Sequence, residues 1–244
     1  MKALLILGGV RIGDMWHVVP IINRLKRDYD DITLVTGTYE KAVAEALTTI
    51  YNLKLEIHSD GFPQDIHSRE WFYNQYKDKY DFKKFDYVFS DWKSTFEFEP
   101  NWKVELIETY LPEGFINKAK KEQIVVQVDS TSSCKRVDSL FHVQFPYPVV
   151  CVGGRDERRI PGSIDMMGRP WLEVLNTICE SKLYVGIHSA ATCAAFYTGV
   201  PMVVADYGKN FNFANYGHPN VIHLYDLPST DRIQEAVNKL LEIK

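Results

Sequence analysis

Short apolar runs alternate with stretches of helical periodicity through both halves of the chain. The run at 3–7 ends in Gly8-Gly9, which is typical of a strand that is buried on both faces. From Asp14 onward the apolar residues recur at helical spacing, with charged residues on the opposite side. This alternation of strand and helix predicts a parallel sheet with right-handed crossover connections.

The same pattern occurs twice, on either side of a linker at 111–121 that contains turn residues followed by a run of lysines. The first half is predicted to hold strands at 32–35, 53–57 and 87–89 and a helix at 39–50. The second half is predicted to hold strands at 124–128, 149–152, 183–187, 202–205 and 221–224, and helices at 171–180, at 189–198 and from 229 to the end. We therefore expect an α/β fold of two Rossmann-like parallel-sheet halves, 1–116 and 117–244, that face a cleft.

Composition narrows the class of protein. The 244 residues are 45% hydrophobic and 25% charged, as in a globular protein with a core, and the net charge of -4 argues against a general nucleic-acid binder. No secretory signal is visible, and no run approaches the roughly 20 apolar residues that cross a bilayer. The cysteines lack C-x-x-C spacing, which favours free thiols in a reducing cytoplasm; they are Cys134, Cys151, Cys179 and Cys193.

Aromatic side chains crowd the segment 61–85. One interpretation is an amphipathic helix packed on the sheet. The other is an aromatic wall for an acceptor sugar or an apolar aglycone.

The first candidate site is the glycine-rich turn at 8–14. It lacks the Lys-Ser/Thr of a Walker A loop, and Val10 stands where a dinucleotide fingerprint would need glycine. Asp14 follows the predicted first strand, at the edge of the sheet where ligands of such folds collect. It is interpreted either as a helix N-cap or as a general base for an acceptor hydroxyl.

Two further polar loops follow predicted strands of the second half. The segment 130–136 combines hydroxyls with Lys135-Arg136, which suits a diphosphate leaving group and equally a solvated surface loop. The segment 153–159 begins with Gly153-Gly154 and contains Glu157 and three arginines. The glutamate is a candidate for ribose hydroxyls and the arginines for phosphate; the alternative is an exposed, salt-bridged loop.

The fourth candidate, at 186–195 with Gly199-Val200-Pro201, is the most specific. Small residues at a strand-to-helix junction leave a helix N-terminus exposed, where amides can bind a pyrophosphate. Ser189 is a candidate N-cap and Thr192 a candidate hydroxyl ligand. Tight packing of the helix on its sheet also explains the alanines.

Taken together, the four segments resemble glycosyltransferase family nine, the lipopolysaccharide heptosyltransferases and their relatives. Gly13-Asp14 with Pro20 looks like the family's first strand-to-helix element, and Gly186 to Pro201 looks like its donor loop. The resemblance implies that Asp14 is the catalytic base. Gly13 and Arg11 are the candidate acceptor-side residues. The motifs and the resemblance together give a candidate donor-binding set of Ser130, Thr131, Lys135, Arg136, Gly153, Gly154, Glu157, Arg169, His188, Ser189, Ala190, Ala191 and Thr192.

Three positions of the donor loop depart from the family pattern: His188 replaces aspartate, Ala190 replaces glycine and Cys193 replaces the usual histidine. The backbone-amide part of the site tolerates these changes, whereas the side-chain contacts must differ.

The predicted activity is an inverting, heptosyltransferase-like transfer from a nucleotide-diphosphate sugar, bound by 117–244, to a glycan or glycolipid hydroxyl on 1–116. No metal or other cofactor is expected, because cations and a helix terminus would stabilise the leaving diphosphate. Asp28-Tyr29-Asp30 is predicted to be a surface segment and not a metal site, since it falls where the first helix ends. A nucleotide-sugar epimerase of the same architecture and a non-catalytic nucleotide- or sugar-binding module remain alternatives.

Overall fold

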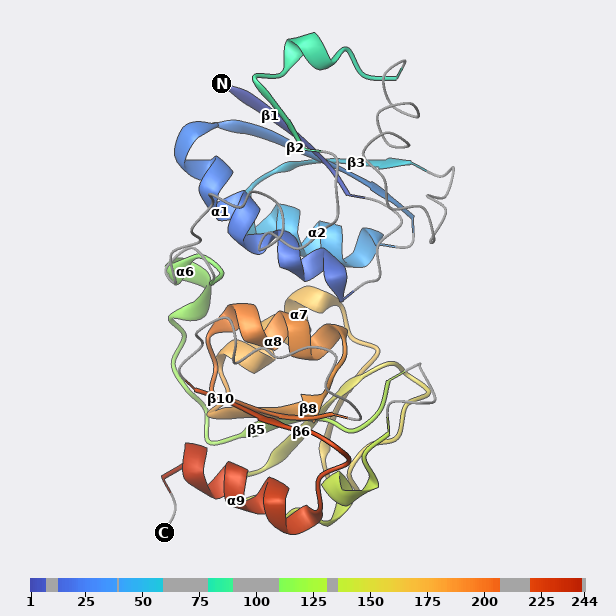
Figure 1. Cartoon of the computed structure of the whole chain (residues 1–244), viewed down its shortest axis with the longest axis vertical. Helices are drawn as coiled ribbons and strands as arrows, with labels where there is room; N and C mark the ends of the chain where they lie inside the picture. The colour runs from blue at the N-terminus through green and yellow to red at the C-terminus, as the bar shows by residue number, and fades with distance from the viewer. Residues whose placement is uncertain are drawn as a thin grey trace. The chain divides into compact units, whose positions relative to one another are not determined.

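The computed structural model describes residues 1–7, 13–38, 40–58, 79–89, 110–130, 136–206 and 220–242. Its internal contacts divide the chain into two units, Met1–Pro112 and Glu113–Lys244. Each unit contains its own sheet flanked by helices, and every strand pairing in both sheets is parallel (Figure 1). The predicted α/β class with two parallel-sheet halves is therefore confirmed.

The first unit has a four-stranded sheet in the order β3-β2-β1-β4. Its strands are β1 (Lys2–Ile6), β2 (Asp31–Gly37), β3 (Lys54–His58) and β4 (Tyr87–Phe89). Its helical elements are η1 (Asp14–Val18), α1 (Val19–Asp28), α2 (Lys41–Tyr51) and η2 (Phe82–Lys84). β1 lies inside the sheet, so its residues from Ala3 onward are fully buried, as a continuous apolar run predicts.

The first helix begins later than its periodicity predicts. A 3-10 turn, η1, precedes α1, and Pro20 is the second residue of α1. Proline suits the first turn of a helix because the N–H that it lacks would have no partner in the helix there. The apolar stripe of α1 is buried, whereas Arg24, Lys26 and Arg27 are exposed.

The second unit has a six-stranded sheet in the order β10-β9-β8-β5-β6-β7. Its strands are β5 (Ile124–Gln127), β6 (Val149–Gly153), β7 (Ile164–Met167), β8 (Leu183–Ile187), β9 (Met202–Ala205) and β10 (Val221–Leu224). Numbered from β5, this is the Rossmann order, and its topological switch point lies between β5 and β8.

Helices cover both faces of this second sheet (Figure 1). They are α6 (Glu113–Ile116), η3 (Asp138–His142), α7 (Trp171–Cys179), α8 (Ala190–Thr198) and α9 (Thr230–Leu240). α7 packs on α8, and η3 packs on α9. All residues of α8 after Ala190 are buried, and its alanines allow this close packing.

Strand β7 was not predicted from the sequence. Among the described strands it lies at an edge of the sheet and pairs with β6 alone, and Ile164 is 54% exposed. An edge strand with such weak burial lacks the hydrophobic periodicity by which strands are recognised.

Among the residues described, no helix has both the length and the apolar character needed to cross a membrane.

Candidate functional site

The carboxyl ends of β5, β6 and β8 meet at the switch point of the second sheet. Gln127 is the last residue of β5 and Gly153 the last residue of β6, while Ser189 follows β8 by two residues. Ligands of open parallel sheets bind in the crevice outside these strand ends. The candidate site therefore consists of the side chains at this edge.

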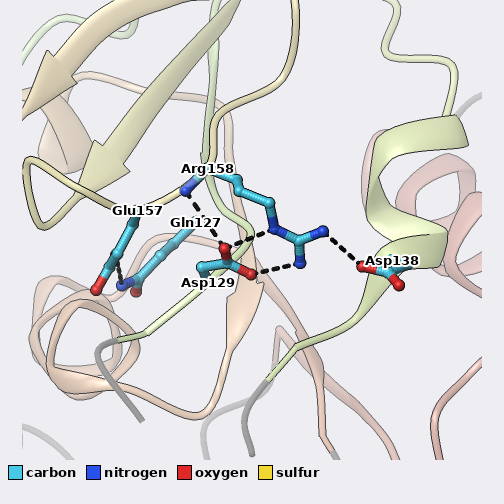
Figure 2. Close-up of polar contacts among 5 residues, drawn as sticks. All are labelled: Gln127, Asp129, Asp138, Glu157 and Arg158. Atoms are coloured by element: carbon cyan, nitrogen blue, oxygen red, sulfur yellow. Dashed lines mark hydrogen bonds and ion pairs between the residues drawn. The ribbon is translucent and has the colours of Figure 1, made fainter. Parts of the chain in front are cut away.

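The side chain of Gln127 lies at the centre of this edge and is 5% exposed. Its Nε2 lies 3.4 Å from Oε2 of Glu157, which comes from the loop after β6 (Figure 2). Its Oε1 accepts hydrogen bonds from the hydroxyl of Ser189 and, at 3.3 Å, from the phenol of Tyr184. The buried side-chain amide of Gln127, at the end of β5, thus contacts β8 and the segments that follow β6 and β8.

Helix α8 begins next to the side-chain amide of Gln127, because its N-cap residue, Ser189, donates a hydrogen bond to that amide. The Oγ of Ser189 accepts the N–H of Thr192 at 3.3 Å, so the predicted N-cap is confirmed. Gly199, with φ 71°, closes the helix in the left-handed conformation, as predicted. The remaining first-turn amides have no partner within the helix, and the positive end of its dipole lies at the carboxyl edge of the sheet.

Thr192 has a different role from the one expected. Its side chain is fully buried, its hydroxyl donates to the carbonyl of Ile187, and it lies 3.0 Å from Oη of Tyr184. The hydroxyl holds the strand-to-helix turn together from inside and does not open onto the edge.

The glycines at the end of β6 make room for Glu157. Gly153 has φ 148°, and a methyl group on it would clash with Oε2 of Glu157; one on Gly154 would lie 3.2 Å from Oε1. A carboxylate of the same loop therefore approaches these glycines closely. The carboxylate of Glu157 therefore lies over these two glycines and within 3.4 Å of Gln127.

Arg158 ties this loop to the segment after β5 (Figure 2). Its Nε and Nη2 donate to the two carboxylate oxygens of Asp129 at 2.7 Å each, and its Nη1 donates to Asp138 at 2.8 Å. These bonds lower the pKa of Asp129 and raise that of Arg158, because each stabilises the charged form of its partner. The guanidinium also lies 4.9 Å from the ring centre of Phe141.

The arginines of this loop thus differ from the phosphate ligands expected. Arg158 is held by two carboxylates, and Arg159 forms an ion pair with Asp165. The stem of Arg155 lies against Gly168, where an added methyl group would clash with it. For these side chains, the salt-bridged loop is the better description.

His188 lies next to the cap of α8 and faces Asp206, the residue after β9. Its Nδ1 is 3.6 Å from Oδ2 of Asp206, and Nε2 of His223 is 3.3 Å from the same oxygen. The ring of His223 stacks on Tyr225 with 4.3 Å between centroids. Burial, with the nearby Asp206 carboxylate, raises the pKa of Tyr225.

The structure places three more of the predicted site residues. The backbone of Arg136 forms an antiparallel β-bridge with that of Asp129, close to the end of β5. Arg169 is exposed after β7, at the far edge of the sheet from β10. Gly13 is the N-cap of η1, so Asp14 is the first residue of that turn rather than its cap.

Some predictions lie outside the described residues. These are Arg11, Thr131, Lys135, Cys134, the side chain of Asp14 and most of the aromatic segment 61–85.

Sequence reasoning missed Gln127, Asp129, Tyr184 and Asp206. A signal existed for three of them. Gln127 lies in an apolar strand, where a polar side chain needs a buried partner, and Asp129 and Asp206 directly follow the predicted strands 124–128 and 202–205. Nothing in the pattern distinguished Tyr184 from an ordinary core residue.

No protein-family model matches the chain, and no curated protein sequence matches it significantly. Solved structures do. The Escherichia coli ADP-heptose lipopolysaccharide heptosyltransferase II superposes with a TM-score of 0.69 at 13% identity, covering 99% of both chains. A glycosyl transferase of family 9 from Veillonella parvula gives 0.61 at 13%, covering 100% of this chain and 98% of the other.

Two further structures extend this comparison. E. coli heptosyltransferase WaaC with ADP-2-deoxy-2-fluoro heptose gives a TM-score of 0.64 at 9% identity over 99% of both chains. The Neisseria meningitidis UDP-GlcNAc 2-epimerase gives 0.55 at 11%, covering 99% of this chain and 92% of the other. The chain therefore has the GT-B type of fold that these heptosyltransferase structures share.

Proposed function

We propose that the chain is a heptosyltransferase-like glycosyltransferase that moves a sugar from a nucleoside-diphosphate donor to a hydroxyl acceptor. One observation supports this most strongly: Glu157 and the capped N-terminus of α8 meet at one buried amide, at the switch point of a Rossmann-ordered sheet. A carboxylate suits ribose hydroxyls, and a helix N-terminus suits a diphosphate.

In this proposal residues 117–244 bind the donor. The first-turn amides of α8 at Ala190 and Ala191, with Lys135 and Arg136, stabilise the charge that develops on the leaving diphosphate. Preorganised donors and cations of this kind can replace a metal ion electrostatically, so the proposed reaction needs none. The heptosyltransferase solved with ADP-2-deoxy-2-fluoro heptose supports the choice of a nucleotide sugar.

Residues 1–116 bind the acceptor, and Asp14 is the proposed base. Its backbone follows β1, an inner strand of the first sheet and one of the two at that sheet's switch point. Asp14 removes the proton of the acceptor hydroxyl as the oxygen attacks the anomeric carbon. The bond from that carbon to the diphosphate oxygen breaks, and one displacement inverts the configuration.

The test combines binding with turnover. Thermal-shift screening against ADP-, GDP-, UDP- and CDP-sugars identifies the donor, since a ligand at 100 times its Kd adds about 2.7 kcal/mol of stability. Asp14→Asn should lower kcat by about 10² to 10⁴ while donor binding stays near normal. Asp28→Asn, at an exposed end of α1, is the matched control and should retain full activity. Full activity of Asp14→Asn would refute the base assignment.

An epimerase is the second candidate, because a UDP-GlcNAc 2-epimerase shares the fold. Such an enzyme needs no acceptor. Turnover of a nucleotide sugar in acceptor-free buffer would favour it over the transferase. Binding without turnover across donors and acceptors would instead favour a non-catalytic binding module.

A further inference from the structure

Gln127 lies between the two groups to which the proposed function assigns the ribose and the diphosphate. Its Nε2 lies 3.4 Å from Glu157, and its Oε1 accepts from Ser189, the N-cap of α8. The side chain is almost fully buried, so water does not substitute freely for either partner.

The hydrogen-bonding groups allow one orientation of this amide. An ionised carboxylate only accepts, so the NH2 of Gln127 must face Glu157. With the NH2 group facing Glu157, the carbonyl oxygen of Gln127 faces Ser189, whose hydroxyl donates to it. A flipped amide would set two oxygens against each other at Glu157 and leave the serine hydroxyl without its acceptor.

A second link fixes the same two segments. Asp129, two residues after Gln127, holds Arg158, the residue after Glu157 (Figure 2). The ion pair limits where the loop after β6 can move, while the amide of Gln127 sets the direction of the carboxylate. Glu157 is thereby held at a defined place relative to the N-terminus of α8.

We propose that Gln127 is a positioning residue that makes the site selective for ribonucleoside diphosphates. It orients the carboxylate of Glu157 toward the ribose hydroxyls of a nucleotide whose diphosphate lies at the N-terminus of α8. This inference rests on the proposed function.

Gln127→Glu tests the proposal at constant shape. The variant keeps an oxygen for Ser189 and Tyr184 but turns a second oxygen toward Glu157, which repels the carboxylate and removes its donor. Calorimetry measures the Kd of ADP and UDP and of their 2′,3′-dideoxy analogues. We expect wild type to prefer the ribonucleotide about tenfold, and the variant to lose this preference while its dideoxy affinity is unchanged.

The pH profile distinguishes positioning from general disruption. Two carboxyl groups this close share a proton as the pH falls, and the protonated oxygen can then donate to its neighbour. The ribose preference of Gln127→Glu should therefore return between about pH 8 and pH 5. A merely structural defect has no reason to recover on acidification.

Gln123→Glu is the matched control: it makes the same substitution at the residue before β5 begins. Gln123 donates to the carbonyl of Thr177 at 3.4 Å, so its loss affects stability without touching the strand ends at the site. Gln127→Asn is the second variant: it adds no charge but is too short to keep both contacts, and it should also lose the ribose preference.

The outcomes separate the two proposals. A wild type that binds no nucleoside diphosphate overturns the proposed function, and the inference with it. Wild-type binding without ribose preference overturns the role of Glu157 and of Gln127 together. Ribose preference that survives in Gln127→Glu or Gln127→Asn overturns the inference alone.

Discussion

The phenol of Tyr184 lies over Gly186, two residues further along β8: a methyl group built on that glycine would come within 2.5 Å of the phenol oxygen. Tyr184 is fully buried, and its hydroxyl contacts Gln127 and Thr192 beneath the cap of α8. Burial raises the pKa of this phenol, which stays neutral and able to donate. Gly186 therefore makes room for Tyr184, whose hydroxyl hydrogen-bonds to Gln127 in the candidate site.

Gly186→Ala should destabilise the second unit. The added methyl group must displace the phenol from its hydrogen bonds, and overpacking of this kind costs about 1–3 kcal/mol. Urea unfolding measures the change. Gly114→Ala in α6 is the control, because nothing lies within 4 Å of its added methyl group and alanine favours a helix. Equal stability of wild type and Gly186→Ala would contradict this account of the glycine.

Ser189→Ala should weaken both stability and nucleotide binding. It removes the N-cap of α8 and the hydroxyl that orients Gln127, and loss of a cap costs about 1 kcal/mol. Ser229→Ala is a matched control, since Ser229 caps α9 in the same way by accepting the N–H of Arg232 at 3.4 Å.

Both cap variants should lose stability in urea, and Ser189→Ala should lose more, because it also removes a buried hydrogen bond to Gln127. Only Ser189→Ala should raise the Kd for the nucleotide sugar found by thermal shift. If the two variants changed that Kd equally, the cap of α8 would have no specific part in binding the ligand.

Much of the fold followed from hydrophobic pattern. Continuous apolar runs placed β1 and β8 correctly because both are buried on two faces. The pattern failed at β7, whose edge position leaves Ile164 exposed. Periodicity reports how completely a segment is buried, so it detects central strands better than edge strands.

The candidate site was predictable in part. Ser189 and Gly199 were recognised because caps have local residue signatures. The pairing of Asp129 with Arg158 was not, since it joins loops 29 residues apart, and which arginine finds which carboxylate depends on strand order. Thr192 was misread for a similar reason: its hydroxyl has an acceptor in its own turn that composition does not reveal.

Asp129→Asn should destabilise the protein in a pH-dependent way. Hydrogen bonds from Arg158 lower the pKa of Asp129, so its ionised form stabilises the fold. This contribution is complete above the unfolded pKa of about 3.9 and is lost as the pH falls through the lower folded value.

We expect Asp129→Asn to cost about 1.5–3 kcal/mol at pH 7, as for a hydrogen bond to a charged group. The difference from wild type should shrink below about pH 4. Asp165→Asn, which breaks the exposed pair with Arg159, should change stability by less than about 1 kcal/mol. Urea unfolding at pH 7, 4 and 3 measures all three proteins. A pH-independent effect at Asp129 would show that packing, not charge, dominates there.

Cys179, the last residue of α7, makes stability sensitive to alkaline pH. Burial raises the pKa of its thiol to about 11. An acid whose pKa is raised by folding stabilises the protein fully below the unfolded pKa, about 8.5 for cysteine, and loses that contribution as the pH rises toward the folded value. Between pH 8 and 9.5 the wild type should therefore lose about 1 kcal/mol through this thiol, from a limiting slope of about 1.4 kcal/mol per pH unit.

Cys179→Ala should lack this part of the alkaline loss, although the cavity it creates lowers stability at every pH. Ile178→Val is the matched control: it shortens the neighbouring buried side chain and should keep the wild-type pH slope, because it removes no titrating group. Urea unfolding at pH 8 and 9.5 compares the three, a range chosen to end below the ordinary tyrosine pKa of about 10. An identical slope in Cys179→Ala and wild type would mean that the thiol ionises as readily in the folded chain as in the unfolded one.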